Sequence, residues 1–200
     1  TTLQQYTISY DNNTGGGTIS DQYKDHGATA TLNNGNNFSR TGYTLSKWHT
    51  NADGTSGTDY ALGGSYTANA DVTMYAVWTP NPYTITLNNQ GANTGDEGTE
   101  SISVTYGAST NLSGTPAITV PTKTGYTFGG YYTEMNGEGA QIIAANGNVI
   151  AEVDDGEEIY TSKDKEWLYA NDITLYAKWT ANTISLVLDR NGVTGSDGSA

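Results

Sequence analysis

The chain has 200 residues, of which 35% are hydrophobic and only 14% charged; its formal net charge is −13, and it contains no cysteine. Its 21 acidic against 8 basic residues argue against binding to nucleic acid or to anionic lipid, because both depend on Lys and Arg. The lack of Cys excludes disulfides and thiolate metal sites, and no apolar run is long enough to predict membrane insertion. Gly, Thr, Asn, Ser and Tyr dominate, which favours short strands and tight turns over long helices.

Three sequence blocks occur twice in the same order, which indicates an internal repeat. They are residues 6–10 and 83–87, residues 41–45 and 124–128, and residues 72–79 and 173–180. The offset between the copies grows from 77 to 83 to 101, so the second copy carries 6 additional residues before its middle block and 18 after it. Residues 186–192 match residues 85–91 and therefore resemble a third start.

The blocks follow one recurring pattern. A Tyr-x-Ile strand and an Asn/Gly-rich turn are followed by a Tyr-Gly turn, a Thr-Gly-Tyr block with a later aromatic pair, and a closing Thr-Leu-Tyr-Ala-x-Trp strand. This pattern occupies residues 6–17, 26–27, 41–49 and 72–78, and again residues 83–95, 106–107, 124–132 and 173–179. It resembles the Listeria–Bacteroides repeat family, which includes the internalin B-repeat. The repeated structural signature comprises Tyr43, Trp48, Trp78, Tyr126, Tyr131 and Trp179.

The resemblance implies small β-grasp modules, joined in tandem in secreted and wall-attached bacterial proteins. The predicted class is α+β with strong β dominance, arranged as an elongated rod because the linkers at residues 79–82 and 180–182 are short. We expect repeat 1 at residues 4–80 and repeat 2 at residues 81–181, with an added β-hairpin around residues 134–158. Residues 182–200 are expected to be the first strand of a truncated third repeat.

The closing strands alternate with period two, which predicts half-buried strands. Met74, Ala76 and Trp78 share one face in repeat 1, and Leu175, Ala177 and Trp179 share it in repeat 2. Trp48 and Tyr131 fall on the opposite parity from the residues before them, which favours a β-bulge or an edge position near Lys47 and Gly130.

Three other segments carry weaker signals. Asn146 and Gly147 stand between apolar runs and predict the turn of a hairpin arm, because both residues tolerate positive φ. Residues 162–170 are expected to hold one helical turn. A helix that β-grasp relatives have, at residues 29–39 or 109–119 here, is expected to be reduced or lost because these segments are rich in Asn, Gly and Thr.

His26 and His49 are the only histidines. A catalytic or metal-binding His needs a partner within bonding distance. Both align with aromatic residues of the second copy, Tyr106 and Tyr132, so we interpret them as substituted structural aromatics and predict no enzyme activity and no catalytic residues.

An acidic cluster flanks or tips the predicted hairpin. Residues 81–181 contain 13 acids against four bases, whereas the first 80 residues contain six against three. Asp154, Asp155, Glu157 and Glu158 offer oxygen ligands for Ca²⁺, but their spacing does not match a known Ca²⁺ loop. The alternative is a solvated acidic turn that opposes edge-to-edge aggregation. No other cofactor is expected.

Four tyrosines are candidates for a sugar-stacking platform, since flat rings pack well on sugar C–H faces: Tyr75, Tyr131, Tyr132 and Tyr176. Tyr75 and Tyr176 recur at one repeat position, as a structural cross-strand pair would. Ligand binding and a structural role both remain open for this set.

The sequence therefore predicts a non-catalytic stalk or adhesion module of a secreted or cell-surface bacterial protein, which spaces or presents distal domains. Its partners would be neighbouring repeats of the same chain and a host protein or glycan. The alternative is a carbohydrate-binding module that uses exposed aromatics.

Overall fold

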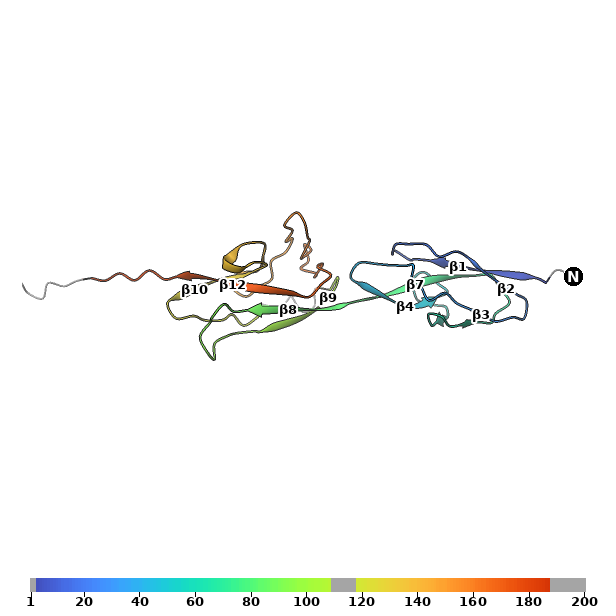
Figure 1. Ribbon diagram of the computed structural model, residues 1–200, viewed down its shortest axis with the longest axis horizontal. Helices are drawn as coiled ribbons and strands as arrows, with labels where there is room; N and C mark the ends of the chain where they lie inside the picture. The colour runs from blue at the N-terminus through green and yellow to red at the C-terminus, as the bar shows by residue number, and fades with distance from the viewer. Residues whose placement is uncertain (1–2, 109–117, 188–200) are drawn as a thin grey trace, which may run out of the picture.

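A computed structural model describes residues 3–108 and 118–187. Within these residues the chain forms two β-sheet bodies that lie end to end along one long axis (Figure 1). The first body contains strands β1 to β7 and the second contains strands β8 to β12. Nearly all regular structure is strand, so the predicted β-dominated class is confirmed.

Repeat 1 is built on one mixed sheet. Its strands are β1 (Gln5–Asp11), β2 (Gln22–Asp25), β3 (Ala30–Thr31), β4 (Tyr43–His49), β5 (Asp59–Tyr60), β6 (Ser65–Tyr66) and β7 (Val72–Pro80). The sheet has the order β2-β1-β7-β4-β5; β1 and β7 are parallel, and the other neighbours are antiparallel. The short strands β3 and β6 form a separate antiparallel pair.

Repeat 2 reproduces this sheet. Its elements are β8 (Pro82–Asn88), β9 (Ser101–Thr105), β10 (Tyr126–Tyr132), the 3-10 turn η1 (Met135–Gly137), β11 (Gln141–Ile143) and β12 (Ile173–Ala181). The order β9-β8-β12-β10-β11 matches that of repeat 1 strand for strand, again with one parallel pair, β8 and β12. The sequence repeat is therefore also a repeat of topology.

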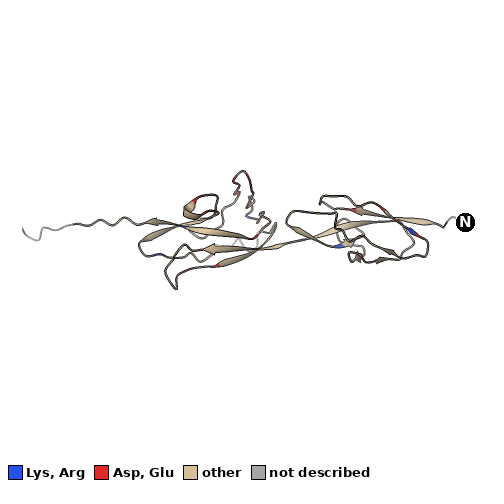
Figure 2. Ribbon diagram, in the orientation of Figure 1, with Lys and Arg blue, Asp and Glu red and all other residues tan. Residues whose placement is uncertain are grey.

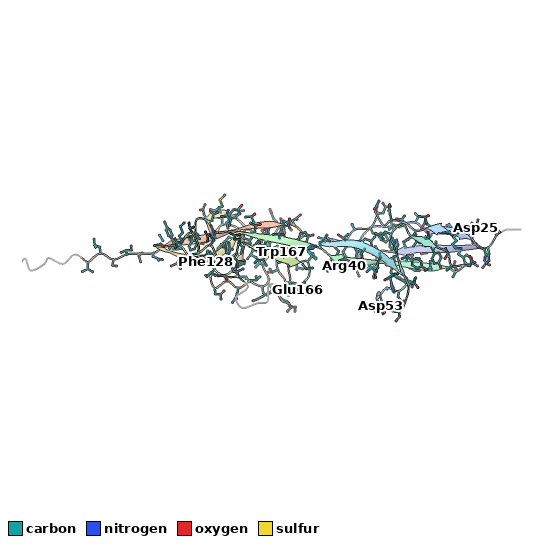
Figure 3. The ribbon with its side chains drawn as sticks, turned by 90° about the horizontal axis from the view of Figure 1, so that it is seen from below. Asp25, Arg40, Asp53, Phe128, Glu166 and Trp167 are labelled. Atoms are coloured by element: carbon teal, nitrogen blue, oxygen red, sulfur yellow. The ribbon has the colours of Figure 1, made fainter. Side chains whose placement is uncertain are left out.

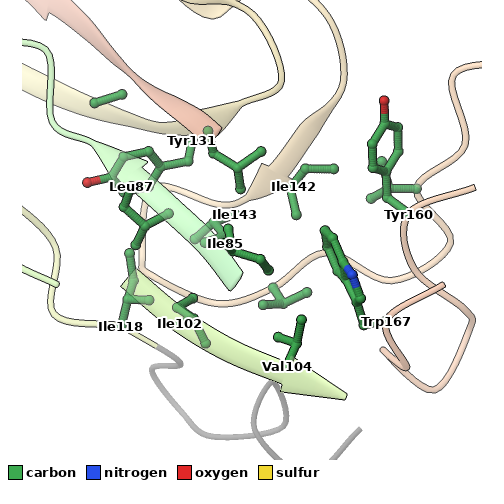
Figure 4. Close-up of a cluster of buried hydrophobic side chains, with 14 residues drawn as sticks. Ile85, Leu87, Ile102, Val104, Ile118, Tyr131, Ile142, Ile143, Tyr160 and Trp167 are labelled. Atoms are coloured by element: carbon green, nitrogen blue, oxygen red, sulfur yellow. The ribbon is translucent and has the colours of Figure 1, made fainter. Parts of the chain in front are cut away.

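Each repeat has its own core, and among the described residues no buried side chain belongs to both. In repeat 1 the core is centred on Ile8, Trp48 and Met74, which are fully buried. The larger core of repeat 2 includes Tyr131 and Trp167 (Figure 4). Because aromatic side chains bury large areas, a few of them give each small sheet a sufficient interior.

The closing strands β7 and β12 confirm the predicted alternation. Met74 and Ala76 are fully buried on one face, and Leu175 and Ala177 are buried at the same positions of repeat 2. The two tryptophans at the ends of these strands also have equivalent surroundings. The indole N–H of Trp78 donates to the carbonyl of Asn12 at 2.8 Å, and that of Trp179 donates to Asn89 at 2.8 Å.

The predicted β-bulges are present in both copies. The pairing of β4 with β7 shifts register between Leu45 and Lys47, and that of β10 with β12 shifts between Phe128 and Tyr131. The bulge turns the next aromatic inward, so Trp48 and Tyr131 are both completely buried. A parity break in the sequence thus marks a real irregularity of the sheet.

The helical predictions are only partly correct. Among the described residues, the one helical element is η1, so the α component of the predicted α+β class is not found there. Residues 162–170 do not form the expected helical turn; Thr161 instead forms an isolated bridge with Trp167. Residues 29–39 contain β3 and turns in place of a helix, as expected from their composition. Residues 109–117 of the second segment lie outside the described residues.

The predicted hairpin around Asn146 and Gly147 exists, but it is not an arm. Ala144 N–H donates to the Asn148 carbonyl at 2.8 Å, and Gly147 has a positive φ of 82°. However, the apolar side chains beside this turn are buried in the core of repeat 2: Ile142, Ile143 and Val149. The prediction of a projecting hairpin is therefore wrong, because those side chains complete the interior. What projects is the acidic loop that follows (Figure 2).

Candidate functional site

A polar site with hydrogen bonds to both repeats lies between them. Only Asn81 separates β7 from β8. Its N–H donates to the carbonyl of Gly42 in repeat 1 at 2.9 Å, and its carbonyl accepts from the N–H of Tyr106 in repeat 2 at 3.0 Å. Its side-chain Oδ1 accepts from the Thr44 hydroxyl at 2.6 Å. The linker residue is therefore held by both repeats.

Aromatic side chains pack across this junction. The rings of Tyr43 and Tyr106 meet edge to face, with centroids 5.5 Å apart. The Arg40 guanidinium lies 3.9 Å from the Tyr43 ring centroid, in a cation–π contact. Figure 3 shows Arg40 and Trp167 near the junction, on the sides of repeat 1 and repeat 2 respectively.

A close backbone approach makes this packing possible. Gly42 has φ of +77°, a conformation that the Thr-Gly-Tyr turn requires. A Cβ added there would lie 2.3 Å from the Tyr106 ring, and one on Gly107 would lie 3.1 Å from the Tyr43 hydroxyl. Each repeat thus presents a glycine to the tyrosine of the other.

The junction is partly dehydrated. Burial raises the pKa of Tyr106 above its ordinary value, and the neighbouring Tyr43 and Tyr83 hydroxyls act in the same direction, while Arg40 opposes them. Tyr106 therefore remains neutral at physiological pH, where its ring is a packing group rather than an acid. We define the junction surface as Arg40, Gly42, Tyr43, Thr44, Asn81, Tyr106 and Gly107.

The proposed sugar platform is not formed as expected. Tyr131 is completely buried, so the prediction that it is an exposed aromatic is wrong; burial raises its pKa to about 12. Tyr132 pairs with Tyr176 across β10 and β12. Tyr75 pairs with His49 at the equivalent position of repeat 1. These pairs favour the structural interpretation, and glycan binding stays a prediction for the half-buried Tyr132 and Tyr176.

In the acidic loop, residues 154–158, two carboxylates accept hydrogen bonds from nearby groups of the chain. Asp155 accepts the backbone N–H of Glu157 at 3.0 Å and that of Glu158 at 2.8 Å, and it also accepts the Tyr160 hydroxyl at 3.0 Å. These hydrogen bonds lower the pKa of Asp155. Asp154 accepts the N–H of Gly156 at 2.7 Å. Within residues 3–108 and 118–187, no three acidic or histidine side chains converge on one point. Calcium binding here stays a prediction.

Both histidines contact groups of repeat 1, and His49 Nε2 lies 3.9 Å from Asp59 Oδ1. His26 is exposed and lies 3.1 Å from the Tyr6 hydroxyl. His49 is buried, and its Nδ1 accepts the N–H of Asn51 at 2.9 Å. Both sit where repeat 2 has tyrosine, as the sequence indicated.

Sequence reasoning missed a buried lysine in repeat 1 that pairs with an exposed asparagine. Lys24 is only 3% exposed, and its Nζ donates to Asn69 Oδ1 at 2.9 Å. By strand pairing and repeat offset, the same positions of repeat 2 hold the apolar Val104 and Ala170. Comparing the copies position by position would have shown this double exchange. The junction surface was missed as well, although its Tyr-Gly and Thr-Gly-Tyr turns were recognised as motifs.

The comparisons with known proteins agree with this architecture. The family model of the Listeria-Bacteroides repeat domain matches residues 6–77 and residues 83–152. The chain belongs to this family. The first matched segment spans the strands of repeat 1 up to most of β7, whereas the second covers β8 to β11 and stops before β12.

One relative is a much longer protein than this chain. The chain is 30% identical over 195 residues to a protein of Evansella cellulosilytica named "Putative Gly-rich membrane protein". The match covers 94% of this chain but only 20% of that relative, so the chain spans about one-fifth of the relative's length. Within the described part of this chain, no helix has the length and apolarity needed to cross a bilayer.

Proposed function

We propose that the chain is a non-catalytic spacer of a cell-surface protein, in which tandem repeats hold other domains at a distance. Each repeat would be a small β-grasp module whose helix is reduced or lost. The strand order supports this proposal, because a parallel pair at the centre of a mixed sheet is flanked by antiparallel strands in both repeats. Family membership supports it independently.

The junction surface is the observation that carries the proposal. A flexible tether would leave its linker solvated, whereas Asn81 is hydrogen-bonded to both repeats and Tyr43 packs on Tyr106. A spacer must resist bending, and direct packing between neighbours provides this resistance without any further contact. Repetition of such units also raises the avidity of whatever the chain presents.

The cellular location and the partners of the spacer are also proposed. The name of the Evansella relative includes "membrane protein", which supports a location at the cell surface. The spacer would present distal domains and contact a host protein through its exposed strands or loops. We assign it no catalytic residues and no cofactor, since both histidines occupy positions of structural tyrosines.

Small-angle X-ray scattering of the whole chain tests the spacer function. We expect an elongated particle whose profile fits one fixed arrangement of the two repeats, because the junction surface restricts their relative motion. A profile that requires an ensemble of widely different angles would contradict the proposal.

An insertion variant provides the control for this measurement. A Gly-Ser-Gly-Ser segment placed between Asn81 and Pro82 separates the two halves of the junction surface without altering either core. We expect this variant to show the conformational averaging of a flexible linker. Equal profiles for both proteins would mean that the junction contributes no stiffness.

A further inference from the structure

The far end of repeat 2 reproduces the repeat 1 half of the junction surface. Asn182 N–H donates to the Gly125 carbonyl at 2.8 Å, as Asn81 does to Gly42. The Thr127 hydroxyl donates to Asn182 Oδ1 at 2.7 Å, as Thr44 does to Asn81. Lys123 places its ammonium 4.8 Å from the Tyr126 ring centroid, where Arg40 covers Tyr43. Figure 3 shows the neighbouring Phe128 toward this end of the molecule.

This second surface is uncovered among the described residues. Tyr126 is 42% exposed, whereas Tyr43 is half-buried against its neighbour. Gly125 has φ of +80°, close to that of Gly42, but a Cβ on Gly125 would meet no described atom within 4 Å. The positive φ of the turn is sufficient reason for a glycine at position 125. It gives no reason for the exposed Tyr126 ring to lie beneath the Lys123 ammonium, as the Tyr43 ring lies beneath Arg40 at the first junction.

The complementary half is present at the start of repeat 1. His26 N–H donates to the Gln4 carbonyl at 2.8 Å, as Tyr106 donates to Asn81. Gly27 has φ of +78° with open space beside it, whereas Gly107 faces the Tyr43 hydroxyl. The end of repeat 2 therefore matches the repeat 1 side of the junction, and the start of repeat 1 matches the repeat 2 side. Such an interface can join further repeats head to tail.

The segment after Asn182, which forms no strand over residues 183–187, indicates which partner is required. Ile184 and Leu186 are 89% and 81% exposed. They align with Tyr83 and Ile85 of repeat 2, and Ile85 is only 1% exposed in its core. Apolar side chains at these positions become buried only when the remainder of a repeat folds around them.

We propose that Lys123, Gly125, Tyr126, Thr127 and Asn182 form a docking surface for a further repeat of this family. The occupant is the aromatic-Gly turn of a repeat whose first strand begins after Asn182, with its Tyr or His ring on Gly125 and against the edge of Tyr126. The inference rests on the proposed spacer function and names the residues through which the spacer is extended.

A chain of three repeats tests the docking surface. Residues 1–183 are followed by a second copy of residues 83–181, so that the new repeat begins in register. Because the protein has no cysteine, labels can be placed at will. Spin labels are attached to Cys residues introduced two at a time at exposed, equivalent positions of the repeats. Asp21 and Ser101 report on the first junction, and Ser101 and its copy in the third repeat report on the second. We expect a narrow distance distribution at the second junction, like that at the first.

Two matched substitutions complete the experiment. Tyr126→Ala should abolish the narrow distribution at the second junction only, and Tyr43→Ala should abolish it at the first junction only. In the original chain, Tyr126→Ala should leave the melting temperature unchanged, because its ring is exposed there. A broad second distribution beside a narrow first one would overturn the docking surface alone, whereas two broad distributions would overturn the spacer function as well.

Discussion

At the scale of single residues, repeat 1 contains a buried charge that repeat 2 lacks. A buried ammonium is costly unless its donors are satisfied. Lys24 is satisfied by Asn69 Oδ1 and by the carbonyl of Asp25 at 3.2 Å, and it lies 5.5 Å from the Tyr6 ring centroid. Asn69 Oδ1 also accepts the N–H of Gly27 at 2.8 Å, so one amide stabilises both the charge and the aromatic-Gly turn.

Asn69→Ala should therefore destabilise repeat 1. The substitution leaves the Lys24 ammonium buried with one acceptor fewer, and we expect a loss of about 1–3 kcal/mol in the free energy of unfolding. Urea denaturation measures this change in the free energy of unfolding. The double variant Lys24→Val with Asn69→Ala installs the apolar pair of repeat 2 and should recover most of the loss. A double variant less stable than the single one would contradict this account.

Tyr131 makes stability depend on alkaline pH. Its pKa is raised from 10.0 to about 12 by burial, so between these values the unfolded chain ionises while the folded chain keeps its proton. The stabilisation is complete below pH 10 and is lost as pH rises toward 12, on the order of 2 kcal/mol. Tyr131→Phe should remove this part of the pH dependence in urea denaturation at pH 7 and pH 11. Tyr23→Phe, at a 64% exposed ring, should retain it.

At the scale of elements, the Thr-Gly-Tyr turn occurs once against a neighbour and once in open space. Gly42→Ala and Gly125→Ala impose similar backbone strain, about 1 kcal/mol, because both glycines have positive φ. Only at Gly42 does the new methyl group meet the Tyr106 ring. We therefore expect an additional loss of about 1–2 kcal/mol for Gly42→Ala.

Differential scanning calorimetry and label distances across the first junction separate the two glycine variants. Gly42→Ala should broaden the distance distribution between labels at Asp21 and Ser101, and Gly125→Ala should leave it narrow. If both variants behave alike, the close approach of Gly42 to Tyr106 does not contribute to the stiffness of the chain.

The acidic loop is expected to act as a capped turn. Asp155→Ala should lower the melting temperature of repeat 2 with or without calcium, because it removes two backbone hydrogen bonds and that of Tyr160. Asp155→Asn retains an acceptor and should lower it less. Thermal melts with CaCl₂ and with EDTA make the comparison. A calcium-dependent rise that is lost in Asp154→Ala with Asp155→Ala would instead establish the predicted metal site.

At the scale of the whole molecule, we expect stiffness to arise from packing at one junction rather than from a shared core. The net charge of −13 gives a second reason for an extended shape, since like charges repel. Figure 2 shows acidic residues along both repeats. Junction packing and charge repulsion can be separated experimentally. At physiological ionic strength, salt largely screens exposed charges that are more than about 8–10 Å apart, but it leaves apolar packing intact. We expect the scattering profile of the unmodified chain to persist at high salt.

Much of the architecture could be predicted because it depends on local patterns. The period-two alternation of apolar residues predicted the closing strands, and the break in that alternation near Lys47 and Gly130 predicted the positions of the bulges. The recurrence of Trp78 and Trp179 predicted equivalent environments, and each indole does donate to the same turn of its own repeat. The repeat itself also required no structure, since each copy has the same sequence of strand and turn signals.

Tertiary structure decided what depends on residues far apart in the chain. Tyr131 looked available for a ligand, but the bulge before it directs its ring into the core. The hairpin at Asn146 was expected to project, but its isoleucines fill an interior whose other walls are β8, β9 and β12. Lys24 finds Asn69, and Tyr43 finds Tyr106, only after the sheets have formed. Periodicity determines which face of a strand is buried, whereas the folded chain determines what that face meets.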